Sequence, residues 1–221
     1  YVPVFAARDM MDKLRAEGFA NESDLMHMQT VLKEMLDHRQ INVDTVVRGL
    51  TNPNIKYRKY QLDAIKFLLH RGSALAALDM GLGKTSISLG VIYDMLGRGD
   101  ITKALVVCPK AVMIHWFKEA RKFYGDSLHV QVIGSDVLVD IKDNIKVVKL
   151  NRAERFNQWR DSKSNVFVVN YDLLKDLYEP EVKPFWTDMP FMIIADEVTR
   201  IKTFNAQRTK NLRNLPAKYR I

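Results

Sequence analysis

The sequence contains a single cysteine, Cys108, and no cluster of Cys and His residues of the kind that binds zinc. One cysteine cannot form an internal disulfide framework, which favours a reducing intracellular setting, and we expect the cytoplasm. No apolar run approaches the roughly 18 residues that a membrane span needs, and no signal segment is visible. These absences argue against a disulfide-stabilised secreted domain, a Cys-rich zinc domain and a membrane protein.

Acidic residues are also in the minority, and their distribution along the chain is uneven. The formal net charge is +8, and the positive excess lies after residue 50, because residues 1–50 carry more acids than bases. No Asp or Glu follows Glu197. Such a balance suits a polyanionic partner, although a solvated basic face explains charge alone equally well.

The length of 221 residues allows one good-sized domain and a small appendage. The chain begins at Tyr1, and its last residues, AKYRI, are typical of the start of another strand. We therefore expect a piece of a longer protein.

The first fifty residues have helical periodicity, with amphipathic helices predicted over 7–17 and 22–38. The sequence TNPN at 51–54 breaks this pattern, because proline disfavours helix in the residue before it. We place a boundary here, with a helical N-terminal segment over 1–52 and a second domain over 53–221.

From residue 56 the pattern alternates between helix and strand. Helices are predicted over 56–72, 84–99, 115–125 and 172–178, and strands over 73–79, 103–109, 129–134, 166–171 and 191–196. Strands separated by helices predict an α/β fold with a mainly parallel sheet between layers of helices. The segment 137–150 is predicted to form a short hairpin inserted beside this sheet.

The sequence DMGLGKTS, residues 79–86, lies between a predicted strand and a predicted helix. Glycines there let backbone N–H groups surround phosphate oxygens, Lys84 can reach the β- and γ-phosphates, and the Thr85 hydroxyl can bind Mg²⁺. Leu78 stands where the general phosphate-loop pattern has glycine, so the match is to a variant. The alternative is a glycine-rich turn with an incidental Lys-Thr. The predicted ATP contacts within this loop are Asp79, Met80, Gly81, Leu82, Gly83, Lys84, Thr85 and Ser86.

A second buried strand, FMIIA, runs directly into Asp196 and Glu197. A phosphate-loop hydrolase needs a carboxylate for the magnesium shell and a group that orients the attacking water. The carboxyl ends of parallel strands meet at one edge of a sheet, where the phosphate loop also lies. Asp196 is therefore a candidate Mg²⁺ ligand and Glu197 a candidate base, although an apolar strand ending in two acids is often only structural.

Together these motifs resemble the N-terminal RecA-like lobe of superfamily-two helicases, specifically the Snf family of double-stranded DNA translocases. The similar segments are YRKYQLDAIKFLL, DMGLGKT, LVVCPKAVMIHWFKEA, VFVVNYDLL and DEVTRIK, in the family's order, over about residues 56–221. The resemblance implies a RecA-like P-loop fold, ATP and Mg²⁺ as cofactors, and Lys84, Asp196 and Glu197 as catalytic residues. It also implies that Gln61 reads adenine.

The same resemblance implies backbone contacts to double-stranded DNA by Lys110, Asn170 and Tyr171. It implies too a second RecA-like lobe of the full-length chain, which supplies an arginine finger. We therefore expect these 221 residues alone to hydrolyse ATP slowly or not at all. Thr199 stands where the family generally has histidine, so we expect the coupling of ATP to DNA to differ here.

Three functions compete for this set of motifs. The first is an ATP-driven motor on duplex DNA. The second is a strand-separating helicase or the motor of a restriction system, which shares all these motifs. The third is a module that docks on DNA or a partner and retains only a weak nucleotide site.

Overall fold

The computed structural model describes residues 41–135, 137–139, 145–161, 163–187, 189–198 and 206–221, together with the helical Ser23, Met26 and Thr30. The predicted helix over 7–17 lies outside the described residues, as does most of the one over 22–38. The division at residue 52 stays a prediction. None of the helices in the described ranges is both long and apolar enough to span a bilayer.

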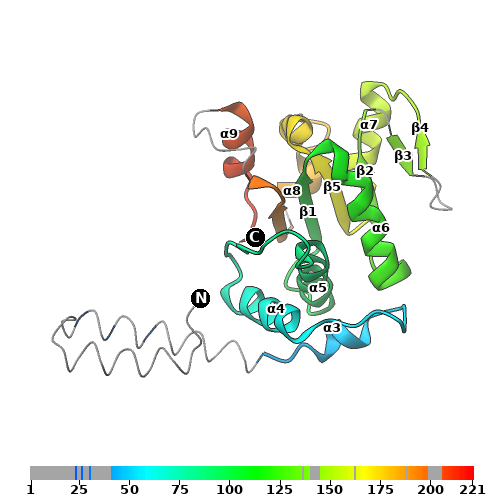
Figure 1. The fold of residues 1–221 in the computed structure, drawn as a ribbon. Coiled ribbons are helices and arrows are strands. Elements are labelled where there is room, and N and C mark those ends of the chain that lie inside the picture. Colours follow the sequence, from blue (N-terminus) through cyan, green and yellow to red (C-terminus); the bar gives the residue numbers. More distant parts are fainter. Residues whose placement is uncertain are drawn as a thin grey trace.

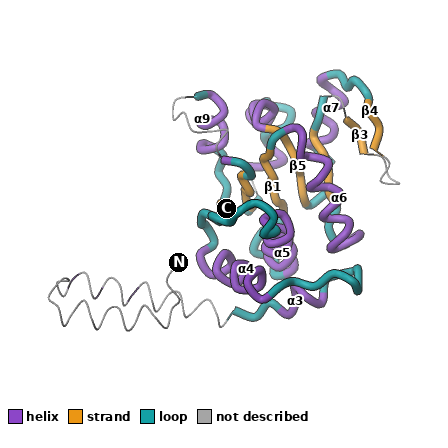
Figure 2. The backbone as a smooth tube through the Cα atoms, viewed as in Figure 1, coloured by secondary structure: helices purple, strands orange, loops and turns teal. Residues whose placement is uncertain are grey.

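Five parallel strands form the central sheet (Figures 1 and 2). Their spatial order is β2-β5-β1-β6-β7, with every neighbouring pair parallel. The strands are β1 (Lys103–Cys108), β2 (Val130–Ile133), β5 (Val166–Asn170), β6 (Phe191–Ala195) and β7 (Tyr219–Arg220). The predicted α/β class with a mainly parallel sheet is therefore confirmed.

The side chains of each central strand alternate between two hydrophobic cores. In β1, Ala104, Val106 and Cys108 face one core, whereas Leu105 and Val107 face the other. Successive residues of a strand point to opposite faces, so a strand covered on both sides must be apolar throughout. This explains why KALVVC reads as a continuous apolar run after its first residue.

Helices cover both faces of the sheet (Figure 1). The first core is closed by α3 (Asp44–Arg48), α4 (Lys59–Arg71), α5 (Lys84–Gly97) and α6 (Met113–Tyr124). The second is closed by α7 (Arg152–Trp159), the 3₁₀ helix η4 (Tyr171–Tyr178), α8 (Pro184–Thr187) and α9 (Gln207–Asn214). Two further 3₁₀ turns are η2 (Lys110–Val112) and η3 (Gly125–Ser127).

The predicted strand over 73–79 is wrong. This segment makes one isolated parallel bridge, Ser73 to Arg220, and the Ala74 N–H donates to the Arg220 carbonyl at 3.0 Å. The neighbouring strand β7 spans only two residues, so it offers ladder partners to the start of the segment alone. The segment therefore reaches the phosphate loop as irregular backbone.

Two other predicted elements have a more specific form in the structure. The predicted helix over 172–178 is a 3₁₀ helix rather than an α-helix, and the Asn170 side chain caps it by accepting from the backbone N–H groups of Asp172 and Leu173. The predicted hairpin is confirmed as the antiparallel pair β3 (Val137–Val139) and β4 (Ile145–Val147), a separate two-stranded sheet.

Candidate nucleotide and nucleic-acid sites

The phosphate loop leads into the N-terminus of α5. Gly83 caps this helix in the left-handed conformation, with φ 82° and ψ 38°, a region in which glycine carries no Cβ penalty. The Lys84 ammonium group folds back over the loop and donates to the carbonyl oxygens of Leu78 at 2.9 Å and Asp79 at 3.2 Å. The Lys84 ammonium group thus lies against the loop that is predicted to bind phosphates, and two carbonyl oxygens of that loop accept its hydrogen bonds.

Two side chains at the start of α4 hold the other side of the loop. The Tyr60 hydroxyl and the Gln61 amide both donate to the Leu82 carbonyl, at 3.2 and 3.3 Å. The Gln61 carbonyl oxygen accepts from the Arg58 backbone N–H at 2.9 Å. The predicted role of Gln61 in reading adenine stays a prediction, and the structure places this side chain directly against the phosphate loop.

The first turn of α5 carries the remaining predicted contacts, Thr85 and Ser86. Ser86 is 5% exposed, and its hydroxyl donates to the Gly83 carbonyl at 2.9 Å. Its own carbonyl accepts from the Tyr57 hydroxyl at 2.8 Å. Ser86 therefore braces the loop from beneath, and its predicted contact with ATP stays a prediction.

The acidic pair follows β6, as predicted. The Asp196 backbone N–H donates to the Val107 carbonyl at 2.8 Å, so the carboxylate emerges at the carboxyl end of the neighbouring strand β1. Glu197 has a φ of 56°, the only positive value among the described residues other than glycine. Such a conformation costs of order 1–3 kcal/mol and clusters at functional sites. The backbone strain thus coincides with the predicted base.

One cavity of about 490 Å³ joins the phosphate loop to the acidic pair. Its wall includes Asp79, Met80 and Lys84 from the loop, and Asp196 and Glu197 from the end of β6. The sequence separates these two groups by more than a hundred residues, and the parallel sheet brings them to one edge.

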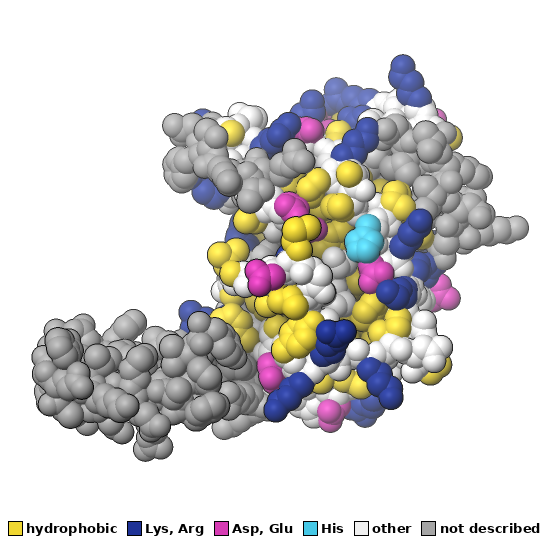
Figure 3. Space-filling view, in the orientation of Figure 1, with side chains coloured by type: hydrophobic (Ala, Val, Ile, Leu, Met, Phe, Trp, Pro, Cys, Tyr) yellow, Lys and Arg dark blue, Asp and Glu magenta, His cyan; other side chains and the backbone are white. Residues whose placement is uncertain are grey.

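The apolar side chains beside this cavity are unusually open to solvent. Met80 is 90% exposed and Leu75 is 72% exposed. Figure 3 shows hydrophobic side chains gathered over the middle of one face of the molecule, with Lys and Arg mainly around them.

The donor atoms in the cavity suit Mg²⁺ bound together with a nucleotide. Magnesium prefers oxygen ligands and is usually held by one or two carboxylates plus substrate phosphates. Asp196 and Glu197 supply carboxylates at the cavity wall. No group of three His, Cys, Asp or Glu residues in the described part of the chain could hold a metal by itself. The two carboxylates therefore fit a magnesium ion that is bound together with the phosphates of a nucleotide.

The predicted DNA-contacting residues meet in a second cavity, of about 310 Å³. Lys110, Asn170 and Tyr171 all line it, and Arg208 of α9 joins them while its guanidinium pairs with Asp172 at 2.5 Å. The Tyr171 side chain is only 4% exposed, and its hydroxyl donates to the Asp196 carbonyl at 2.7 Å. The Tyr171 ring thus belongs to the interior, and its predicted contact with DNA stays a prediction.

Cys108 lines this second cavity and is buried. Burial raises the pKa of its thiol from 9.0 to about 12, and the nearby Asp196 carboxylate adds to this shift. The same two causes raise the pKa of the Tyr171 hydroxyl. Both groups therefore stay protonated at neutral pH.

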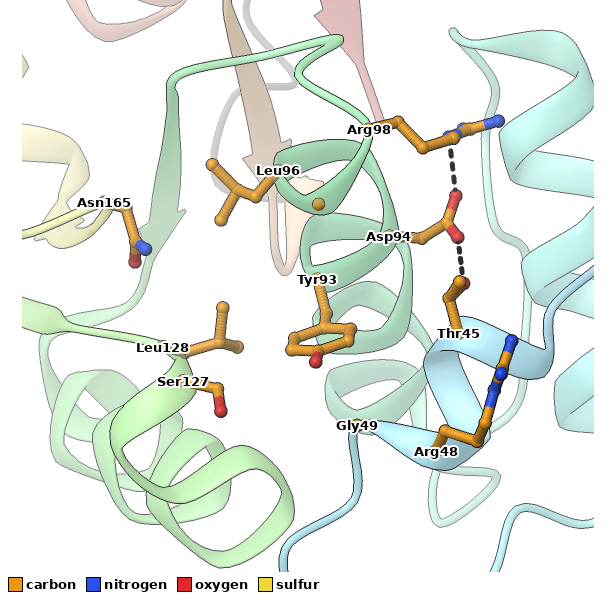
Figure 4. Close-up of a pocket in the computed structure, with 11 residues that line it drawn as sticks. Thr45, Arg48, Gly49, Tyr93, Asp94, Leu96, Arg98, Ser127, Leu128 and Asn165 are labelled. Carbon is orange, nitrogen blue, oxygen red and sulfur yellow. Dashed lines mark hydrogen bonds and ion pairs between the residues drawn. The ribbon is translucent and has the colours of Figure 1, made fainter.

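A third cavity, of about 600 Å³, lies away from all the predicted site residues (Figure 4). It is formed where α3 meets the C-terminal end of α5. Figure 4 shows the Asp94 carboxylate between Thr45 and Arg98, with distances of 2.5 Å to the Thr45 hydroxyl and 2.9 Å to the Arg98 guanidinium. The Thr45 contact anchors α3 to the helix that follows the phosphate loop, whereas the Arg98 pair lies within the C-terminal end of that helix.

Sequence reasoning missed one residue at the nucleotide cavity. Trp116, interpreted above only as part of a motif, donates its indole N–H to the Asp196 carboxylate at 2.9 Å and lines the cavity. A buried tryptophan usually needs a partner for its N–H. That requirement was a usable signal, but the sequence did not say which acceptor lies nearby. Thr199 lies outside the described residues.

The comparisons with known proteins agree with this geometry. The model of the SNF2-related domain matches residues 60–221. The bifunctional helicase and thymine dioxygenase JBP2 of Leishmania braziliensis is 25% identical over 205 residues, covering 88% of this chain and 18% of that protein. The DNA repair and recombination protein RAD54B of Gallus gallus is 26% identical over 196 residues, covering 81% of this chain and 19% of that protein.

Among solved structures, the Sulfolobus solfataricus SWI2/SNF2 ATPase core in complex with double-stranded DNA superposes with a TM-score of 0.55 at 26% identity. The match covers 78% of this chain and 33% of that one. The chain thus spans about a fifth of the length of these curated relatives and a third of the solved core.

Proposed function

The chain belongs to the family of SNF2-related domains, a helicase-like ATPase family, and from this premise we propose that it is the ATP-binding lobe of a motor that translocates on double-stranded DNA. The observation that carries the proposal is the shared cavity of Lys84, Asp196 and Glu197. A phosphate-binding lysine and two carboxylates at one sheet edge are the parts that hydrolysis of a nucleoside triphosphate requires.

In this mechanism Lys84 exchanges its two carbonyl partners for the β- and γ-phosphates of ATP. The exchange is favourable because the ammonium group then pairs with a negatively charged phosphate, whereas the carbonyl oxygens of Leu78 and Asp79 are neutral. The backbone N–H groups at the start of α5 add the positive end of the helix dipole.

The two carboxylates have separate tasks. Asp196 and the Thr85 hydroxyl would hold Mg²⁺, which when bound neutralises charge on the phosphates. Glu197 is exposed, next to Asp196, and would orient the attacking water and accept its proton. Glu197 lies two residues beyond the end of β6, whereas Asp196 follows the strand directly.

The second cavity supports the DNA part of the proposal. Lys110 follows β1 and Asn170 is the last residue of β5, a parallel neighbour whose carboxyl end lies beside that of β1. Cationic and amide groups at such an edge can position a phosphate backbone without reading bases. The solved SWI2/SNF2 core is itself described as a complex with double-stranded DNA. We propose duplex DNA as the partner on these grounds.

The test is the ATPase rate of the full-length protein without nucleic acid, with single-stranded DNA and with duplex DNA, at a stated salt concentration. We expect duplex DNA to stimulate hydrolysis most, and the stimulation to weaken as salt rises, because phosphate contacts release counterions. Equal rates in all three conditions would overturn the proposal. An unchanged rate in the Lys84→Ala variant would instead favour a docking module with a weak nucleotide site.

We further propose that hydrolysis needs a second lobe, since the chain covers only a third of the solved core. The isolated 221 residues should therefore turn over ATP slowly or not at all. Full DNA-stimulated turnover by this piece alone would contradict that expectation.

Displacement assays separate the duplex motor from the strand-separating alternative. A translocase displaces a triplex-forming strand but leaves the duplex paired, whereas a helicase releases one strand of the duplex. We expect triplex displacement alone.

A further inference from the structure

Asp196 accepts hydrogen bonds from two residues that lie in or just beyond the segments lining the second cavity, which we call the DNA cavity because we propose that it binds DNA. Its carboxylate accepts from the Trp116 indole N–H at 2.9 Å, and its backbone carbonyl accepts from the Tyr171 hydroxyl at 2.7 Å. Trp116 follows the loop that carries Lys110, and Tyr171 follows Asn170. The Asp196 backbone is therefore in contact with Tyr171, which lines the second cavity, and its carboxylate is in contact with Trp116, five residues after Ala111 of the same cavity.

Trp116 lies on the helix that follows the Lys110 loop, and its side chain contacts Asp196. It lies in the first turn of α6, which begins directly after the 3₁₀ turn Lys110–Val112. Its side chain is 2% exposed and lines the nucleotide cavity with Asp196. Because protein interiors are densely packed, a shift of the Lys110 loop would strain the packing around this buried indole.

We propose that Trp116 is a positioning residue that transmits occupancy of the DNA cavity to the Asp196 carboxylate. An indole N–H donates one hydrogen bond and accepts none, so it holds one carboxylate oxygen in a defined direction. When DNA phosphates engage the Lys110 loop, the start of α6 shifts and the carboxylate turns toward the magnesium position. The inference rests on the proposed function and adds the residue that links its two sites.

The decisive variant is Trp116→Phe, which removes the donor and keeps an aromatic ring. A matched control exists on the other face of the sheet. Trp159 is also fully buried and donates its indole N–H to a carboxylate, Asp176, at 3.3 Å. Trp159→Phe makes the same chemical change away from both cavities. A third variant, Trp116→Gln, returns an N–H donor of similar reach without the ring.

Two measurements on the full-length protein test the proposal. The first is the kcat and KM for ATP with saturating duplex DNA. The second is a titration of Mn²⁺, standing in for Mg²⁺, into the ADP-bound protein, followed by electron paramagnetic resonance. Removing a group that orients a metal-binding carboxylate typically costs 10–100-fold in metal affinity or activity.

We expect Trp116→Phe to lower kcat about tenfold with the KM for ATP nearly unchanged, and to weaken Mn²⁺ binding about tenfold. Trp159→Phe should leave both quantities at wild-type values, and Trp116→Gln should recover most of the Mn²⁺ affinity. If Trp116→Phe does not fold, the Mn²⁺ affinities of Trp116→Gln and Trp159→Phe are compared. Similar affinities support the role of the N–H donor, and a much lower affinity of Trp116→Gln overturns it.

The proposal is overturned if Trp116→Phe and Trp159→Phe behave alike, or if both Trp116 variants lose Mn²⁺ affinity equally, which would make the ring's bulk responsible. A wild-type protein that hydrolyses ATP without stimulation by DNA would overturn the proposed function and the transmission with it. The Mn²⁺ titration would still show whether Trp116 orients Asp196.

Discussion

Replacing Gly83 with alanine tests how the phosphate loop is built. Gly83 has a φ of 82°, and a Cβ added there would meet the Gln61 amide nitrogen at 2.4 Å and the Ser86 hydroxyl at 2.8 Å. Both of these atoms make hydrogen bonds that hold the loop, to the carbonyls of Leu82 and Gly83. The new methyl group would therefore strain the backbone and displace two side chains together.

The magnitude follows from these two effects. A left-handed residue with a Cβ costs about 1–2 kcal/mol, and each displaced hydrogen bond about 1 kcal/mol. Gly83→Ala should thus lower the free energy of unfolding by about 3–4 kcal/mol. It should also weaken nucleotide binding, because the start of α5 is displaced. Urea denaturation followed by circular dichroism measures the first effect, and titration with a fluorescent ATP analogue measures the second.

Two other glycines separate the causes. Gly81 has the same φ, 82°, but its Cβ would meet nothing within 4 Å, so Gly81→Ala should cost only the backbone strain of about 1–2 kcal/mol. Gly97 ends α5 without a positive φ and without neighbours, so Gly97→Ala should be neutral or stabilising by up to about 1 kcal/mol. Equal losses of unfolding free energy for Gly81→Ala and Gly83→Ala would show that the contacts of the new methyl group with Gln61 and Ser86 do not matter.

Three further predictions follow from the described contacts. Lys84→Ala should lower the DNA-stimulated ATPase rate of the full-length protein about 10²–10³-fold, because the phosphates lose a charged donor; phosphate release measures this, and a near-wild-type rate would contradict it. Arg155→Met should lower the free energy of unfolding by about 3–5 kcal/mol in urea, because the 2%-exposed carboxylate of Asp176 loses its guanidinium partner at 2.7 Å. A loss under about 1 kcal/mol would show that this carboxylate does not need the pair. Cys108 should resist alkylation at pH 9 in the native protein and react in urea, because burial raises its pKa to about 12. Mass spectrometry measures the labelling, and rapid alkylation of the native protein would contradict this prediction. The buried thiol therefore stabilises the fold fully below about pH 9 and progressively less as the pH rises toward 12.

Much of the fold could be predicted from local patterns. The apolar runs of β1, β5 and β6 read as buried strands because strands covered on both faces have no polar side. The helix over Lys59–Arg71 ends at Gly72, as its glycine indicates. The error at 73–79 has a non-local cause, since a strand exists only where a neighbour supplies hydrogen bonds, and β7 supplies few.

The candidate site, too, could be predicted from the sequence only in part. The loop around Lys84 and the acids after β6 could be recognised because their chemistry needs particular residues next to particular elements. Gln61 was identified only through a family resemblance, and its contact with the Leu82 carbonyl came from the structure. The internal position of the Tyr171 ring could not be predicted, because an aromatic residue after a strand can point inward or outward.

The sequence by itself determined the buried strands β1, β5 and β6, the helices that follow residues 58 and 83, the phosphate loop and the acidic pair, because each depends on residues close together in the chain. Only the tertiary structure decided which distant groups meet. Trp116 and Asp196 are eighty positions apart, and their hydrogen bond exists because β1 and β6 pair in parallel with α6 packed over them. A side-chain donor selects its acceptor by proximity in space, and that proximity is a property of the packed sheet and helices.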